Sequence, residues 1–227
     1  MPYIILLILL LAVVFGPQWW AQWTFRRYAA EREDLPGSGA ELASHLLDKM
    51  NISDVGVEQT DRGDHYDPEA KMVRLSAENH NGRSLTAVAV AAHEVGHAIQ
   101  HHRKERMLER RTRLVRSAQW AQKIGAAMMF AIPVITAITK MPQSGLLLFL
   151  VGLGSMAMAT VVHLITLPVE MDASFNKALP LISHGRYINH RDQRAVKRIL
   201  RAAALTYVAA SLASLLNLAR WFRFFRC

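Results

Sequence analysis

The sequence predicts a mainly α-helical membrane protein with three to four transmembrane helices and a small water-exposed α+β domain. Three observations lead to this fold class. The 227 residues are 52% hydrophobic and yet carry a net charge of +9, which is an unusual combination for a soluble domain. Apolar and basic stretches also alternate along the chain. Finally, the segment between the first two apolar stretches carries helix-capping and turn signals typical of a folded domain.

Four apolar stretches are candidates for the transmembrane helices. Each falls within the range of about 17–25 residues that a transmembrane helix needs to cross the ~30 Å hydrocarbon core of a bilayer. The first, Tyr3–Phe25, ends in a group of tryptophans that suit a bilayer interface, and no lysine or arginine precedes it. It is therefore predicted to be an uncleaved anchor rather than a signal peptide. The others are residues 120–139, 145–167 and 202–219.

These stretches divide the chain into five predicted segments. They are an N-terminal transmembrane anchor (residues 1–27), a cytoplasmic subdomain (28–119), a transmembrane helical hairpin (120–167), a second cytoplasmic segment (168–201) and a last transmembrane or membrane-packed helix (202–227). Basic residues follow the first span and flank the later ones. The positive-inside rule then predicts that both water-exposed segments face the cytoplasm.

His93, Glu94 and His97 stand in an H-E-x-x-H pattern inside an apolar stretch. Residues four apart share one face of a helix, so the two imidazoles can bind the same metal ion. Glu94 is turned by about 100° from its neighbour, which places its carboxylate beside the metal. A base at this position can take a proton from a water molecule held by zinc. The pattern also occurs by chance on ordinary surface helices.

A catalytic zinc site needs a third protein ligand. His101 is excluded, because it lies about 12 Å from His93 along a helix axis at 1.5 Å per residue. The metzincin pattern is absent, since Gln100 and Arg103 stand where it needs glycine and histidine. Glu170 is the best candidate, because a carboxylate just past a long apolar stretch is costly unless it is paired or binds a cation. The alternative is that it merely ends a helix and faces water.

Four other side chains are candidates for supporting roles. Asp172 is a candidate acceptor for a ligand imidazole N–H, which would fix the tautomer of that ring, although it can equally face water. Candidates for binding substrate or stabilising the oxyanion are His80, Tyr66 and His163.

Local signals indicate how the first cytoplasmic segment folds. Ser38 and Glu41 form a capping box at the start of a helix with an apolar stripe. Val55–Val57 and Met72–Leu75 are predicted strands, joined by turn residues into a short β-hairpin next to the motif helix. The second strand is a candidate for binding an extended substrate, and a purely structural hairpin is the alternative. Ser84 is the predicted N-cap of the motif helix.

Several longer stretches carry a resemblance to a known family. They are Asp64–Pro68, Val73–Ser76, Asn81–Leu85, Ala91–His101, Leu167–Glu170 and Arg201–Ala209. Together they resemble the YugP-like family of multi-pass membrane zinc metallopeptidases of bacteria, over most of the chain from residue 37 onward. The resemblance implies a zincin-like metallopeptidase domain with one Zn²⁺ ion held by His93, His97 and Glu170, and Glu94 as the catalytic residue. The related HtpX-like proteins have an aspartate four residues after the ligand glutamate, where this chain has Ser174.

The expected function is that of a membrane-integrated zinc endopeptidase of the bacterial inner membrane, acting at the cytoplasmic side on membrane or membrane-proximal proteins. Two alternatives stay open. A site-2-type intramembrane protease is disfavoured because the chain lacks a Leu-Asp-Gly motif. A non-enzymatic zinc-binding scaffold is disfavoured because structural sites normally have four protein ligands.

The expected partners are a protein or peptide substrate and anionic lipid headgroups close to the basic stretches. No nucleic acid is expected, since no recognition motif accompanies the basic residues. The single cysteine, Cys227, excludes an internal disulfide and fits a reducing compartment. The sequence leaves the oligomeric state open.

Overall fold

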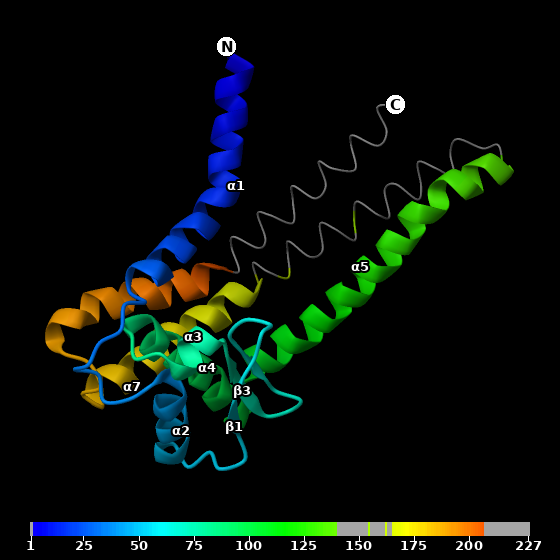
Figure 1. Ribbon diagram of the computed structural model, residues 1–227. Coiled ribbons are helices and arrows are strands. Elements are labelled where there is room, and N and C mark those ends of the chain that lie inside the picture. Colours follow the sequence, from blue (N-terminus) through cyan, green and yellow to red (C-terminus); the bar gives the residue numbers. More distant parts are fainter. Residues whose placement is uncertain (1, 140–153, 155–161, 163–164, 207–227) are drawn as a thin grey trace. The chain divides into compact units, whose positions relative to one another are not determined.

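The computed structural model describes residues 2–139, 154, 162 and 165–206 (Figure 1). The chain forms two compact units. The second unit comprises Gln18–Glu109 and Leu167–Thr206, and the first unit takes the remaining residues. The second unit therefore combines most of the predicted cytoplasmic subdomain with the predicted segment around Glu170, although the apolar stretches separate them in sequence.

The helices and strands follow one another along the chain in a simple order. They are α1 (Pro2–Arg27), α2 (Gly39–Lys49), β1 (Gly56–Gln59), β2 (His65–Asp67), β3 (Met72–Leu75), α3 (Ala77–Asn81), α4 (Leu85–His102), α5 (Arg106–Thr139), the π-helix η1 (Asp172–Ala178), α7 (Leu179–His184) and the 3₁₀-helix η2 (His190–Asp192). Residues 165–171 and 193–206 are also helical. The predicted mainly helical chain with a small sheet is thus confirmed.

The described part of the chain contains no helix with the length and apolar character needed to cross a membrane. This finding contradicts the predicted membrane protein with three to four transmembrane helices. Polar residues interrupt the helices in which two spans were expected: α1 holds Pro17, Gln18 and Gln22 in its second half, and α5 carries charged side chains as far as Lys123. The predicted spans 145–167 and 202–219 lie largely outside the described residues.

The sheet of the second unit has three strands in the order β1-β3-β2. β1 runs parallel to β3 with Val57 opposite Val73, whereas β2 runs antiparallel to β3 with Tyr66 opposite Val73. The two predicted strands exist, but they do not form a hairpin with each other; the hairpin consists of β2 and β3. β3 is the central strand and has a neighbour on both sides, so the suggestion that it binds substrate along an open edge is wrong.

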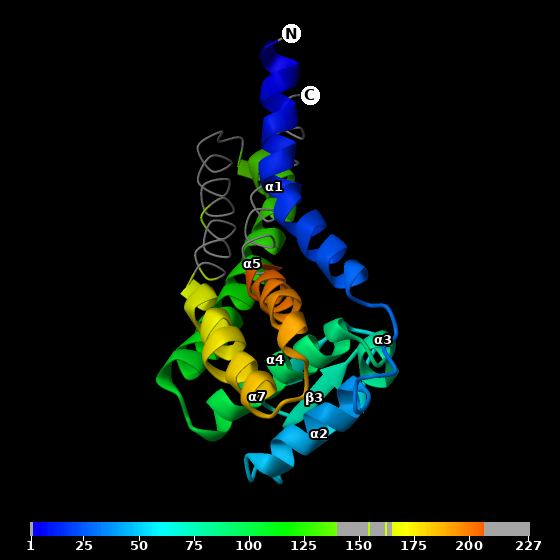
Figure 2. The same ribbon diagram turned by 90° about the vertical axis from the view of Figure 1, so that its left-hand side faces the viewer.

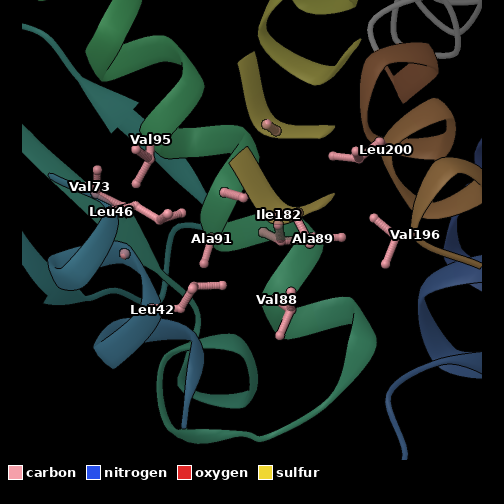
Figure 3. Close-up of a cluster of buried hydrophobic side chains, with 14 of the residues drawn as sticks. Leu42, Leu46, Val73, Val88, Ala89, Ala91, Val95, Ile182, Val196 and Leu200 are labelled. Carbon is pink, nitrogen blue, oxygen red and sulfur yellow. The ribbon is translucent and has the colours of Figure 1, made fainter. Parts of the chain in front are cut away.

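Helix α4 occupies the centre of the second unit, in contact with α2, α3, β2, β3, η1 and α7 (Figure 2). Every residue from Leu85 to Gln100 is buried, including the polar residues of the H-E-x-x-H motif. Burial on all sides is expected for a helix whose other residues are nearly all apolar. Figure 3 shows side chains of neighbouring elements meeting around α4, among them Leu46 of α2, Val73 of β3 and Ile182 of α7. This central position holds the H-E-x-x-H motif rigidly inside the unit.

Both predicted helix caps are confirmed. The backbone N–H of Ala87 donates to Oγ of Ser84 over 3.0 Å at the start of α4. At the start of α2, Ser38 and Glu41 exchange the reciprocal hydrogen bonds of a capping box. Each cap satisfies backbone donors that the first helical turn leaves without an intrahelical acceptor.

Replacing the buried N-cap of α4 is expected to destabilise the second unit. Ser84→Ala removes the acceptor of the Ala87 N–H and should lower the free energy of unfolding by about 1 kcal/mol. Denaturant unfolding measures this change. Ser117→Ala is the matched control, because the exposed Ser117 hydroxyl donates to the Arg113 carbonyl within the same helix, α5, and its loss should be close to neutral. Equal effects of the two substitutions would contradict the capping role.

Candidate metal centre

His93, His97 and Glu170 come together inside the second unit, and their candidate ligand atoms all lie within 4.8 Å of one another. Nε2 of His93 lies 3.3 Å from Oε2 of Glu170, and Nε2 of His97 lies 3.0 Å from the same oxygen. The imidazoles are each 4% exposed and Glu170 is fully buried. Two nitrogens and one carboxylate oxygen at this spacing can share an ion with bonds of about 2 Å.

The tautomer of His97 is fixed by Gln100. The Gln100 side-chain NH₂ donates to the carbonyl of Val169 over 3.0 Å and to Oδ2 of Asp172 over 2.8 Å. Because both of these partners are acceptors only, the amide oxygen must face His97, where it lies 3.0 Å from Nδ1. Nδ1 therefore carries the proton, and the Nε2 lone pair points toward Glu170.

Ser174 fixes the tautomer of His93 in the same way. Its hydroxyl donates to the carbonyl of Leu200 over 3.2 Å, so its oxygen accepts from Nδ1–H of His93 over 3.0 Å. The Nε2 lone pair of His93 is then directed at the same point as that of His97. Partners of this kind hold the rings of metal-binding histidines in place and increase their basicity.

Asp172, predicted to accept from a ligand imidazole, instead contacts Gln100. Its carboxylate also accepts from Asn176 and from Lys177, at 2.8 and 2.7 Å. Burial opposes ionisation, but the hydrogen bonds from Lys177, Gln100 and Asn176 outweigh it and hold the pKa of Asp172 below its usual value. Asp172 therefore reaches His97 only through the Gln100 amide.

Gly96 lets the two ligand-bearing segments approach each other closely. A Cβ at this position of α4 would lie only 2.7 Å from the backbone oxygen of Ala173 in η1. Because Gly96 has no side chain, the π-helix η1 packs directly against α4. Glu170 precedes η1 in the chain, and Ser174 lies within it. A π-turn inside a helix is frequent at functional sites, and here it aligns side chains five residues apart.

The remaining predicted residues are placed differently. Glu94 is 7% exposed and lies between the two histidines on α4. Tyr66 lies on β2, with its hydroxyl 2.7 Å from Nδ1 of His101, and burial raises the pKa of Tyr66 to about 12. His80 lies in α3 with Nδ1 2.8 Å from Oδ1 of Asn81. His163 lies outside the described residues.

Gln100 and Ser174 hold the two histidines but are absent from the sequence-based predictions. A usable signal for Ser174 is its spacing, because it follows Glu170 by four residues, where HtpX-like proteins have an aspartate. Gln100 follows His97 by three residues and so shares its helix face, which is a signal for a neighbour of that ring. The donor set of two imidazoles and a carboxylate, with both Nδ1 protons satisfied, fits a catalytic zinc site.

Comparisons with known proteins agree with this donor set. A family model described as "Putative neutral zinc metallopeptidase" matches residues 3–226. A curated relative, the "Putative membrane protease YugP" of Bacillus subtilis (strain 168), is 36% identical over 227 residues, covering 97% of this chain and 96% of the relative. No solved structure is significantly similar. The family resemblance inferred from the sequence stretches is therefore confirmed.

Adding a methyl group at Gly96 should loosen the metal centre. The Cβ of Gly96→Ala must displace the η1 backbone, and overpacking of this kind costs about 1–3 kcal/mol. We expect weaker binding of Zn²⁺, measured by competition with a chelator, together with a lower free energy of unfolding. Gly16→Ala is the matched control, since no atom lies within 4 Å of the Cβ it would add. Unchanged metal affinity in Gly96→Ala would contradict the close approach.

Proposed function

The chain belongs to the zinc metallopeptidase family whose model it matches, and on that premise we propose that it is a zinc-dependent endopeptidase that hydrolyses peptide bonds of proteins. The proposal rests on the buried side chains of His93, His97 and Glu170, whose candidate ligand atoms lie close together. Glu94 lies on α4, the same helix as the two histidines. A carboxylate and two imidazoles are the ligand set of several zinc peptidases, which keep a fourth position for water or substrate.

In the proposed mechanism His93, His97 and Glu170 would hold one Zn²⁺ ion. Bound zinc would supply Lewis-acid chemistry, lowering the pKa of water and polarising the scissile carbonyl. Ser174 and Gln100 keep the two imidazoles in the tautomer that offers Nε2 to the metal. The protein thereby fixes the ligand atoms before substrate arrives, which removes reorganisation from the reaction.

Glu94 is the proposed general base. Its carboxylate accepts a proton from the attacking water as the oxygen adds to the scissile carbonyl carbon, and it then delivers that proton to the departing amine nitrogen. The C–N bond breaks in that second step, and the carboxylate returns to its ionised form. The low exposure of Glu94 keeps bulk water away from this proton transfer.

The sheet suggests how a substrate could lie. β2 is an edge strand that contacts α4, whereas β3 is enclosed between two neighbours. An extended peptide can add to such an edge through backbone hydrogen bonds. We therefore propose β2 rather than β3 as the substrate strand, with Tyr66 on β2 as a candidate donor to the oxyanion.

A bilayer surface with anionic headgroups is the second proposed partner. Trp19 and Trp23, 64% and 51% exposed, lie one helical turn apart on α1. Arg27 follows one turn later, with its guanidinium 5.0 Å from the centre of the Trp23 ring. Exposed tryptophans beside arginine favour the interface between water and lipid. The relative from Bacillus subtilis is itself named a membrane protease.

Replacing the general base should separate catalysis from metal binding. We expect Glu94→Gln to keep one Zn²⁺ per chain by elemental analysis and to hydrolyse a labelled unfolded protein at least about 100-fold more slowly. The amide has nearly the shape of the carboxylate but cannot take the proton. Glu78→Gln, on α3, is the matched control and should leave hydrolysis unchanged.

Two outcomes would count against the proposal. Full hydrolysis by Glu94→Gln would exclude this residue as the base, and absence of bound metal in the wild-type protein would exclude the metal centre. A non-enzymatic scaffold makes a different prediction, because wild type and Glu94→Gln would then bind zinc equally and neither would cleave protein.

The tryptophan pair should promote vesicle binding. The double substitution Trp19→Ala, Trp23→Ala is expected to reduce co-sedimentation with vesicles of mixed zwitterionic and anionic lipid, because it removes both aromatic rings from the contact. Gln18→Ala with Gln22→Ala, the same spacing on the same helix, is the matched control. Equal binding by both double variants would contradict the proposed lipid contact.

A further inference from the structure

A chain of polar contacts runs from the metal centre to a lysine outside it. Gln100 bonds His97, Asp172 bonds Gln100, and Lys177 bonds Asp172 over 2.7 Å. Nζ of Lys177 also lies 3.0 Å from a carboxylate oxygen of Glu105. The Lys177 side chain is only 12% exposed, so its charge is largely removed from water and depends on these two carboxylates.

The π-helix explains why a lysine reaches this position. In η1 the backbone hydrogen bonds connect residues five apart, so Asp172 and Lys177 are stacked on one side of the helix. A regular α-helix would rotate Lys177 away from Asp172, because its repeat is 3.6 residues per turn. The loop that carries Glu105, the second partner of Lys177, is also held in place. Its backbone N–H at Glu105 donates to the carbonyl of Gln100 over 3.0 Å.

Lys177 separates two carboxylates that would otherwise face each other. Without its ammonium group, Asp172 and Glu105 would repel and Asp172 would lose a charge-assisted hydrogen bond. A displaced Asp172 would leave the NH₂ group of Gln100 held by the carbonyl of Val169 without the carboxylate. The amide oxygen that fixes the His97 tautomer would then be held less firmly against Nδ1.

We propose that Lys177 is a positioning residue for the metal ligand His97, acting through Asp172 and Gln100. The inference rests on the metal centre of the proposed function. It gives Lys177 a share in the metal affinity, although Lys177 is not one of the metal ligands. Glu105 keeps Lys177 in place from the loop that follows α4. Lys177 thereby links that loop, η1 and the histidine ring into one polar network.

The test measures metal affinity in the full chain, without relying on hydrolysis. Lys177→Met should raise the Zn²⁺ dissociation constant several-fold in competition with a chromogenic chelator, and by less than the ~10- to 100-fold typical of groups bonded directly to a metal ligand. Lys177→Arg, which keeps the charge, should restore most of the affinity. The visible absorption of the Co²⁺-substituted protein should change in Lys177→Met, which a purely structural lysine would not cause.

Lys71→Met is the matched control. Lys71 forms an ion pair of 2.6 Å with Asp54, and both side chains are about half exposed. Its loss should leave the Zn²⁺ dissociation constant and the Co²⁺ spectrum unchanged. Equal shifts in the Lys71 and Lys177 variants would overturn the proposal, as would wild-type affinity in Lys177→Met.

A second pair of variants covers the case in which Lys177→Met does not fold, because Asp172→Asn removes the repulsion between Asp172 and Glu105 that the loss of Lys177 would leave. Asp172→Asn removes the charge that Lys177 balances but keeps an oxygen for Gln100. If Lys177 acts only through the Asp172 carboxylate, Asp172→Asn and the double variant Asp172→Asn, Lys177→Met should have equal dissociation constants. A further loss in the double variant would overturn the pathway through Asp172.

The two levels of inference fail in different ways. If the wild-type protein binds no zinc, both the proposed function and the positioning role of Lys177 are wrong. If the wild-type protein binds zinc and cleaves substrate but Lys177→Met keeps full metal affinity, only the role of Lys177 is wrong.

Discussion

The fully buried carboxylate of Glu170 is the constraint on which the second unit depends. A carboxylate removed from water is stable only beside compensating groups. Here the unprotonated Nε2 atoms of two imidazoles lie within 3.3 Å of one of its oxygens, so a bound cation would supply the compensating charge for all three atoms. The surrounding features serve this arrangement: Gly96 admits the neighbouring backbone, α4 is buried along its length, and hydrogen bonds from both Nδ1 atoms keep the rings oriented.

The two halves of this arrangement lie far apart in sequence, and each is built by a different device. The histidines come from one regular helix with a capped start, so their relative position follows from helix geometry alone. Glu170 and Ser174 come from a helical segment that changes to a π-turn at Asp172. The centre therefore depends on tertiary packing between α4 and η1, because neither segment contains all the ligands.

Local sequence signals predicted much of this unit. The H-E-x-x-H helix, both serine caps and strands β1 and β3 follow from short-range patterns. The parallel pairing of β1 with β3 does not follow from such patterns. It depends on β2, which has only three residues and lies among turn residues. The π-turn and the role of Gln100 have no local signature, since both acquire meaning only when η1 packs on α4. The expectation of membrane spans came from apolar composition, which buried helices such as α4 share.

The enclosure of the centre has a kinetic consequence. With His93 and His97 each 4% exposed and Glu170 fully buried, an ion held by them would exchange with solution through local opening of the second unit. The rate of that opening, rather than diffusion, would then limit the uptake and release of metal. A polypeptide would reach the ligands through the same opening. Residues that hold η1 against α4 would therefore also affect the turnover rate.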